Sequence, residues 1–308
     1  MSSSFPYGAQ IVNSRTKGIE DTLSVSPQMS RRAFLRFASC ACVAGVGGQY
    51  AALIAPNRIA VNVLDVFIQE LPYSLEGLRL GVMSDFHVGD YVPAQLVSTA
   101  VETMNALRPD AVMLPGDFFQ DQTSQAEACA DALSDLIAPL GVFACPGNHD
   151  HHLNLKATEI PMGRAGVDML VNDSRRIVHG GATLHIVGLD SITEGYPNHF
   201  RALSAVPKDE LALLLVHEPD HADALVQTTQ RLMPLQISGH SHGGQVRLPF
   251  IGAPILPALA HIYPQGLKRV HGSSRQVFTT TGIGVNLPVR LNCPPEVALL
   301  TLRRTPEA

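Results

Sequence analysis

Five short apolar runs in this chain each end in a cluster of histidine, aspartate or asparagine. Short apolar runs are typical of buried strands, and these cover residues 78–83, 111–114, 141–145, 211–216 and 235–238. Longer amphipathic stretches separate most of them, which predicts helices between the strands. Open α/β sheets build their sites from polar residues at the carboxyl ends of strands. The chain is therefore predicted to be an α/β protein whose site is assembled from five loops.

The rest of the chain continues this alternation without an internal repeat. Helices are predicted over residues 93–107, 124–138, 155–166 and 220–228, and further strands over 60–68, 176–178, 183–190, 276–280 and 297–302. The last two strands are expected to close the sheet, after a proline- and leucine-rich loop over 247–265. The chain has 308 residues, of which 45% are hydrophobic, so it can bury a large core. A single domain over 56–308 is predicted.

The last polar cluster, Gly239–Gln245, places two histidines one residue apart between glycines. Neighbouring side chains diverge in an extended or turning segment, so His240 and His242 suit two adjacent metal ions better than one. The flanking glycines lack the Cβ atoms that would crowd such a centre. This cluster predicts a dinuclear site if the other four clusters reach the same place.

The five clusters together offer imidazole nitrogens and side-chain oxygens. The candidate residues are Asp85, His87, Asp117, Asn148, His149, His217, His240 and His242. This mixed set favours Mn²⁺, Fe²⁺ or Zn²⁺, whereas calcium prefers oxygen alone. No cysteine joins the set, which argues against a structural zinc site. Two divalent metal ions are therefore expected, with Mn²⁺ favoured.

The order of these motifs resembles that of the calcineurin-like metallophosphoesterases. The motifs that carry the resemblance are Asp85-Phe86-His87, Gly116-Asp117, Gly147-Asn148-His149-Asp150, His217 and Gly239-His240-Ser241-His242. The chain is most similar to the bacterial exported or membrane-associated branch that includes the YkuE and YaeI phosphodiesterases, through residues 239–249 and 263–266. The resemblance runs from Leu78 to the C-terminus and implies a four-layer α/β/β/α sandwich.

The resemblance also implies which residues bind each metal ion. One metal is expected to take Asp85, His87, Asp117 and His242, and the other Asp117, Asn148, His217 and His240. A bridging carboxylate such as Asp117 offsets the repulsion between two cations. The implied reaction is in-line attack on phosphorus by a water that both metals acidify.

Two residues next to the predicted ligands have implied catalytic roles. His149 is expected to contact the phosphate and to protonate the leaving oxygen, for which an imidazole is suited. Asp150 is expected either to orient the His149 ring or to play a structural part at the start of the following helix. Many relatives carry an acidic residue three positions after the bridging aspartate, where this chain has Gln120. Because of this difference, it is in doubt whether the loop after Asp117 is held by a side chain at this position as it is in those relatives.

The predicted activity is a phosphodiesterase or pyrophosphohydrolase. Some relatives in this branch cleave UDP-diacylglucosamine, so a lipid-linked pyrophosphate is a candidate substrate. The apolar loop over 247–265 either covers a sheet edge or contacts acyl chains or a membrane. Arg247 and Arg290 are read either as phosphate contacts or as surface cations. The alternatives are a phosphomonoesterase or protein phosphatase on the same metals, and a non-catalytic metal-bound scaffold.

The N-terminal residues 1–55 resemble a twin-arginine export signal. Ser30-Arg31-Arg32-Ala33-Phe34-Leu35 precedes an uncharged apolar run over 38–55, near the lower limit of about 18 residues for a spanning helix. The signal is expected either to be removed near residues 50–52 or to stay as an anchor. The twin-arginine translocation machinery is thus a predicted partner. The protein is expected in the periplasm or anchored to the membrane, with a cytoplasm-facing anchored protein as the alternative.

Composition excludes one class of partner. The formal net charge is −5, aromatic residues make up 6% of the chain, and no long run of lysine and arginine occurs. A general nucleic-acid binder needs a basic footprint, so no nucleic acid is expected. The three cysteines beyond the N-terminal run, at 129, 145 and 293, lack metal-binding spacing and are interpreted as thiols, with room for one disulfide.

Overall fold

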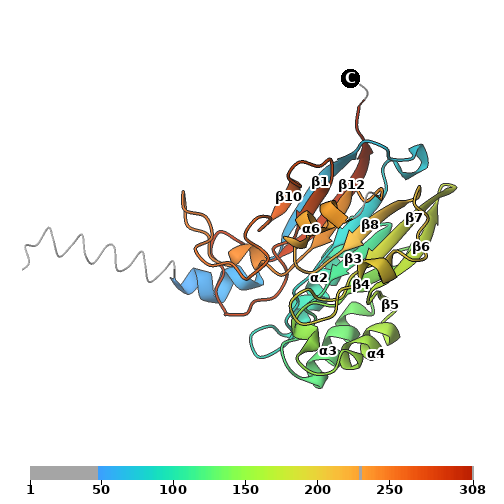
Figure 1. Cartoon of the computed structure of the whole chain (residues 1–308). Helices are drawn as coiled ribbons and strands as arrows, with labels where there is room; N and C mark the ends of the chain where they lie inside the picture. Colours follow the sequence, from blue (N-terminus) through green and yellow to red (C-terminus); the bar gives the residue numbers. More distant parts are fainter. Residues whose placement is uncertain (1–47, 229–230, 307–308) are drawn as a thin grey trace, which may run out of the picture. The chain divides into compact units, whose positions relative to one another are not determined.

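The computed structural model describes residues 48–228 and 231–306, which form two mixed six-stranded sheets packed face to face (Figure 1). The first sheet has the order β1 (Ala60–Ile68), β12 (Glu296–Arg304), β2 (Arg79–Val82), β3 (Ala111–Pro115), β4 (Val142–Cys145) and β5 (Val167–Met169). The second has the order β10 (Gly266–Arg269), β11 (Gln276–Thr279), β9 (Leu235–Ser238), β8 (Leu211–Leu215), β7 (Ala182–Gly188) and β6 (Asp173–His179). Strands β2, β3 and β4 run parallel to one another, as do β7, β8 and β9.

Helices cover the outer face of each sheet. The first sheet packs against α2 (Ala94–Leu107), α3 (Thr123–Leu133) and α4 (Lys156–Arg164), and the second against α5 (His199–Ala202) and α6 (His221–Thr228). Short helical turns occupy Tyr50–Ile54, Ala55–Asn57, Tyr73–Leu75, His149–His151 and His242–Gly244. The predicted four-layer α/β/β/α sandwich is therefore confirmed.

Hydrophobic periodicity explains these layers. In α2, the buried residues Leu96, Val97, Ala100, Val101 and Met104 recur every three or four positions and face the sheet. Strands β3, β4, β8 and β9 are buried at every position, because they are covered on both faces. The core between the sheets therefore consists of branched and aromatic side chains from both.

The structure differs from the predicted elements at a few places. Helix α3 ends at Leu133 rather than at residue 138, and the chain turns at Ser134 ahead of Pro139. Elements β5, β10 and α5 were not predicted, because three or four residues carry too little periodicity. The strands predicted over 276–280 and 297–302 were expected to close one sheet, and this is wrong. They belong to different sheets, because β11 joins the second sheet, whereas β12 lies between β1 and β2 in the first.

The twin-arginine pair and the apolar run as far as residue 47 lie outside the described residues. The rest of that run forms the turns at 50–57, in which Ala51 is buried while Leu53 and Ile54 are exposed. Within residues 48–228 and 231–306, no helix has the length and apolar character needed to cross a membrane.

Candidate metal centre

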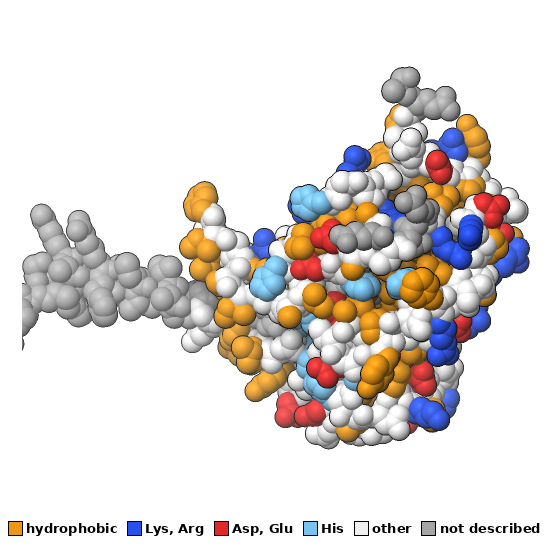
Figure 2. All heavy atoms as spheres, viewed as in Figure 1, with side chains coloured by type: hydrophobic (Ala, Val, Ile, Leu, Met, Phe, Trp, Pro, Cys, Tyr) orange, Lys and Arg blue, Asp and Glu red, His pale blue; other side chains and the backbone are white. Residues whose placement is uncertain are grey.

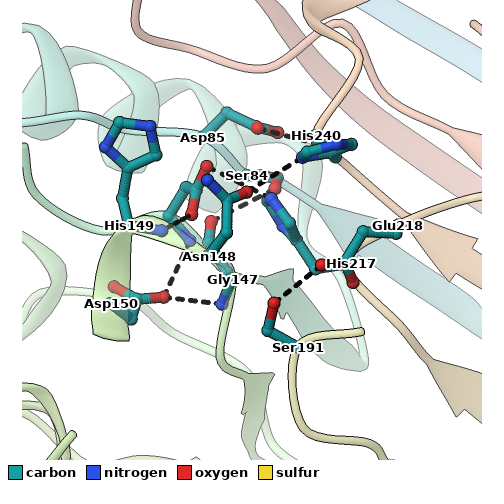
Figure 3. A network of polar contacts seen from close by, with 12 residues as sticks. Ser84, Asp85, Gly147, Asn148, His149, Asp150, Ser191, His217, Glu218 and His240 are labelled. Atoms are coloured by element: carbon teal, nitrogen blue, oxygen red, sulfur yellow. Dashed lines mark hydrogen bonds and ion pairs between the residues drawn. The ribbon is translucent and has the colours of Figure 1, made fainter. Parts of the chain in front are cut away.

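The seven residues predicted to bind metal lie together at one end of the sandwich, beyond the carboxyl ends of five strands. Asp85, His87, Asp117 and Asn148 follow β2, β3 and β4 of the first sheet, whereas His217, His240 and His242 follow β8 and β9 of the second. Each sheet thus supplies part of the site, and Figure 3 shows several of these side chains converging.

One half of the site contains Asp85, His87 and His242. The Nε2 atoms of the two histidines are 3.0 Å apart, and His242 Nε2 lies 3.5 Å from Asp85 Oδ1. His87 Nε2 is also 3.4 Å from Asp117 Oδ2. All four side chains are buried, so these groups face one another with little water between them.

The other half contains His217, His240 and Asn148. His217 Nε2 lies 3.1 Å from Asp117 Oδ2, and His240 Nδ1 lies 3.0 Å from Asn148 Oδ1. Asp117 therefore contacts both halves, as expected of a bridging carboxylate. Its Oδ1 atom accepts a hydrogen bond from the backbone N–H of His149 at 2.9 Å, which fixes the carboxylate.

Hydrogen bonds fix three of the histidine rings so that one nitrogen faces the centre. His217 Nδ1 donates to Pro115 O at 2.6 Å, and His240 Nε2 donates to Ala258 O at 2.8 Å. A carbonyl oxygen can only accept, so these nitrogens carry the proton and the opposite nitrogens present lone pairs inward. His87 Nδ1 likewise donates to Gln120 Oε1 at 3.1 Å. Gln120 thus supports the ligand through a neutral oxygen in place of a carboxylate.

Unpaired polar atoms in this site match a cation site. Among the described residues, Asp85 Oδ2 and His217 Nε2 are buried atoms of this site that make no hydrogen bond. Inward lone pairs facing carboxylate oxygens repel unless a proton or cation lies between them. Burial, opposed by His217 and reinforced by Asp117, raises the pKa of Asp85 to about 7. Divalent cations would relieve both conflicts, so the donor set fits two metal ions.

Five of the seven candidate ligands have left-handed backbone conformations. The φ angles of Asp85, His87, Asp117, His240 and His242 lie between 47° and 68°. Such conformations cost about 1–3 kcal/mol each in non-glycine residues and cluster at functional sites. The loops hold them with backbone hydrogen bonds, such as Asp85 N–H to Gly116 O at 3.0 Å. These residues thus keep unfavourable φ angles, and their side chains point into the site as a result.

Two glycines allow the loops to approach each other closely. A Cβ atom on Gly147 would lie 2.2 Å from Asp117 Oδ1, and one on Gly239 would lie 2.2 Å from Ser84 Oγ. Real Cβ atoms do not approach oxygen so closely, so only glycine fits. Gly239 therefore allows the close approach expected of the glycines around His240.

His149 stands at the edge of the centre. Its ring lies edge-on to that of His87, with centroids 4.5 Å apart, and its Nδ1 is 3.4 Å from Gln120 O. Burial lowers the pKa of His149 below its usual value. The ring is half-buried and therefore stays partly accessible beside the candidate metal centre.

Asp150 binds backbone groups, and no hydrogen bond between its carboxylate and the His149 ring occurs among the described residues. The carboxylate accepts N–H groups of Asp117, Phe118 and Gly147 at 2.9, 3.0 and 2.8 Å. Figure 3 shows the ring and this carboxylate pointing in different directions. The structure therefore favours the structural alternative, in which Asp150 positions the loop of the bridging aspartate. A catalytic role for Asp150 stays a prediction.

An apolar pocket of 340 Å³ opens beside His240 and His242. Its walls include Ile255, Leu256, Leu287 and Val289. The loop over 247–265 has two parts, because Tyr263 is buried against Ala222 of α6 and Val277 of β11, while residues 248–251 are exposed. The buried part packs on α6 and the second sheet, and the exposed part is free to contact another molecule.

The two arginines considered as phosphate contacts lie in different environments. Arg290 is fully buried and donates to the backbone oxygens of Thr281, Gly282, Gly284 and Cys293. Its interpretation as a surface cation is therefore wrong, because it holds the loop beside Asp85. Arg247 is partly exposed and donates to Gly243 O at 3.0 Å.

Sequence reasoning missed several contacts of the site. The carbonyls of Pro115 and Ala258 orient ligand rings, and a backbone carbonyl leaves no signal in residue identity. Asn286 Nδ2 lies 3.4 Å from His242 Nε2. It comes from an irregular segment after β11 that no motif marks, so only the fold brings it here.

Comparisons with known proteins identify a family for this chain. The sequence model for the family described as calcineurin-like phosphoesterase matches residues 78–244. The chain is 31% identical to the uncharacterized metallophosphoesterase YkuE of Bacillus subtilis, over 90% of this chain and 99% of that protein. It is 32% identical to the phosphodiesterase YaeI of Escherichia coli, over 71% of this chain and 80% of that protein. A solved structure, TT1561 of Thermus thermophilus, aligns with a TM-score of 0.45 and 14% identity, over 67% of this chain and 90% of that one.

Proposed function

The chain belongs to the calcineurin-like phosphoesterase family and is a phosphoester hydrolase, and on that premise we propose that it cleaves phosphodiester or pyrophosphate bonds with two Mn²⁺ ions. The observation that carries this proposal is the position of Asp117 between His87 and His217, at 3.4 and 3.1 Å. A carboxylate shared by two groups of imidazoles is the arrangement that two neighbouring cations require. The name of the relative YaeI supports a diester over a monoester.

Two bound cations would acidify an attacking water and hold the phosphate oxygens. The chain contributes the geometry in which this happens. Acceptor oxygens of Gln120, Pro115 and Ala258 place the first proton of three histidines on the outward nitrogen, so the inward nitrogens can offer lone pairs to a cation. Asn148 adds a neutral oxygen beside His240, which leaves the site with net positive charge for an anionic phosphate.

His149 is proposed to deliver a proton to the leaving oxygen. The Gln120 carbonyl lies 3.4 Å from Nδ1, which favours a proton there and leaves Nε2 for proton transfer. Burial lowers the pKa of His149, so the neutral ring prevails at neutral pH until an anionic phosphate favours its protonation. Such a group donates its proton readily in the step that releases the alcohol or phosphate.

The substrate is proposed to carry an apolar group. The pocket beside His240 and His242 has aliphatic walls and a volume of 340 Å³, which fits part of an acyl chain or another apolar group. This is supported by His240 and His242, which line both the pocket and the candidate metal centre. If a phosphate bound at the metals, one of its ester substituents could therefore extend into the pocket. A lipid-linked phosphodiester or pyrophosphate, such as a UDP-diacylglucosamine-like compound, meets both requirements.

Export through the twin-arginine pathway is proposed from Arg31 and Arg32 and the uncharged run after them. The protein would then act in the periplasm or from a membrane anchor. Cell fractionation of a variant with both arginines changed to lysine tests this. The variant is expected in the cytoplasm, and unchanged localisation would contradict export.

The activity is tested with purified protein supplied with Mn²⁺. The substrates are bis(p-nitrophenyl) phosphate, p-nitrophenyl phosphate, a phosphopeptide and a lipid-linked pyrophosphate, with Asp117→Ala as background. The diester and the lipid-linked substrate are expected to be cleaved fastest. Faster cleavage of the monoester or phosphopeptide would indicate a phosphatase, and full metal occupancy without turnover would indicate a scaffold.

A further inference from the structure

Large apolar side chains are exposed on the two segments that line the apolar pocket and on the turn at 50–54 that is bonded to one of them. Phe250 is fully exposed, and Ile251 and Ile255 are 71% and 79% exposed. Leu287 and Leu53 are 68% and 70% exposed. We call these five residues and Ile54 the apolar rim. Exposed patches of this kind mark interaction sites in soluble domains.

The three segments that carry the apolar rim are bonded to one another. Arg290 N–H donates to Ala51 O at 2.9 Å, and Arg247 N–H donates to Leu291 O at 2.9 Å. Ile255 and Leu287 also line the same pocket. Figure 2 shows hydrophobic side chains gathered over this end of the described structure. The rim is thus one surface beside the metal centre.

The segments that carry the rim contain positively charged residues but no aspartate or glutamate. Residues 48–59, 247–265 and 284–294 contain none of the 27 aspartates and glutamates of the chain. They do contain Arg58, which is exposed, and Arg247, which is partly exposed. Apolar side chains flanked by cations without carboxylates favour an anionic lipid surface over a protein partner of mixed charge.

The sequence that precedes the rim also favours a lipid surface as the partner. The described structure begins at Gly48, next to Leu53 and Ile54 of the rim. In the sequence, residues 38–47 before it are uncharged and apolar, and they follow Arg31, Arg32 and Arg36. A basic segment followed by an apolar one is drawn to the interface of an anionic bilayer. The residues that precede the rim in the sequence are therefore expected to have membrane affinity of their own.

We infer that the apolar rim docks on an anionic lipid bilayer, with Phe250 and Ile251 entering the boundary between headgroups and acyl chains. The pocket mouth and the metal centre then face the membrane surface, so a lipid-linked phosphoester reaches the metals without leaving the bilayer. This docking does not depend on hydrolysis, since the rim contains none of the candidate metal ligands.

The test uses the absence of tryptophan from the chain. In the full-length protein, Phe250→Trp places a single reporter in the rim, and Ile160→Trp places one on α4, where Ile160 is 61% exposed. Emission is recorded with vesicles of phosphatidylethanolamine and phosphatidylglycerol, and with vesicles of phosphatidylcholine alone. Lipids brominated along the acyl chain serve as quenchers.

The tryptophan at 250 is expected to emit at shorter wavelength with anionic vesicles and to be quenched by brominated lipid, whereas the one at 160 is unchanged. An unchanged emission at 250 on vesicles that sediment with the protein would overturn the inference, as would a failure to sediment. A short-wavelength emission without vesicles would instead assign the rim to the protein's own N-terminal segment, or to a second copy if it depends on concentration. An equal response to phosphatidylcholine would overturn the anionic preference.

Discussion

The Nε2 atom of His87 lies 3.0 Å from the Nε2 atom of His242, although the two residues are 155 positions apart in the chain. Two imidazole nitrogens bound at right angles to one cation at about 2.1 Å would lie about 3.0 Å apart. Because Gln120 accepts the proton of His87 Nδ1, the lone pair of His87 Nε2 points at this gap. The spacing is therefore that of two ligands of one metal.

The first prediction concerns His240 and His242, which contact different halves of the site. His242→Asn is expected to empty the position near Asp85, whereas His240→Asn empties the one near His217. Each variant should retain about one Mn²⁺ per chain and lose about 100-fold or more in diester hydrolysis. Metal analysis gives the stoichiometry, and anomalous scattering from crystals locates the retained ion. Loss of the same ion in both variants would contradict the assignment.

Gln120 offers a second prediction, because it holds His87 through a neutral oxygen. Gln120→Leu removes the acceptor and is expected to weaken metal binding at that position by about 10-fold. Gln120→Glu restores a carboxylate, which makes the ring more basic, and should bind metal at least as tightly as the natural chain. Calorimetric titration with Mn²⁺ measures both affinities. Equal affinities for the natural chain and the leucine variant would show that the contact is incidental.

Gly147 provides the third prediction. In Gly147→Ala, the new Cβ would lie 2.2 Å from Asp117 Oδ1, so the loops must separate. We expect a loss of about 1–3 kcal/mol in the free energy of unfolding and loss of diester hydrolysis. Gly163→Ala is the matched control, since no atom lies within 4 Å of its added Cβ in α4. That variant should gain about 0.5–1 kcal/mol, and similar effects of the two changes would exclude the steric explanation.

The fourth prediction concerns the ion pair of His151 and Asp190, whose atoms Nε2 and Oδ1 are 2.7 Å apart. The hydrogen bond that His151 donates to Asp190, opposed by burial, raises the pKa of His151. Burial acts to raise the pKa of Asp190, but the hydrogen bonds that its carboxylate accepts from His151 and from backbone N–H groups outweigh burial and lower it. A raised histidine pKa stabilises the fold below about pH 6.5 and loses this effect as pH rises. A lowered aspartate pKa stabilises it above about pH 4.

The pair should therefore contribute most between about pH 4 and pH 6.5, and by about 1 kcal/mol because His151 is partly exposed. Urea unfolding of the natural chain and of His151→Asn at pH 5.5 and pH 8.5 measures this. The difference between the two proteins should shrink at the higher pH. A constant difference would mean that the pair is not ionic.

The sequence predicted which residues come together better than it predicted how they are held. All seven candidate ligands follow strands, and the polar ends of these strands were expected to meet, although the division between two sheets was not visible in the pattern. Their binding of metal stays a prediction. The left-handed conformations of Asp85 and Asp117 were not foreseeable, because φ depends on the loops that cross there. The role of Asp150 was left open for a related reason. Its partners are backbone N–H groups, which every residue type provides.

The same limit explains the errors in the fold. Strands β11 and β12 have equally apolar sequences, and nothing in their periodicity assigns them to different sheets. Arg290 was interpreted as a surface cation because charged residues are usually exposed. Its burial follows from four carbonyl acceptors that only the folded loops 281–284 and 293 bring together.

The division of the candidate ligands between the two sheets has a mechanical consequence. Asp85, Asp117 and Asn148 belong to the loops of one sheet, and His217 and His240 to those of the other. Ions shared between them would act as reversible cross-links across the open end of the sandwich, in a chain whose described cysteines form no disulfide. Removal of the ions by a chelator should then loosen the contact between the loops of the two sheets at that end before the rest of the sandwich unfolds.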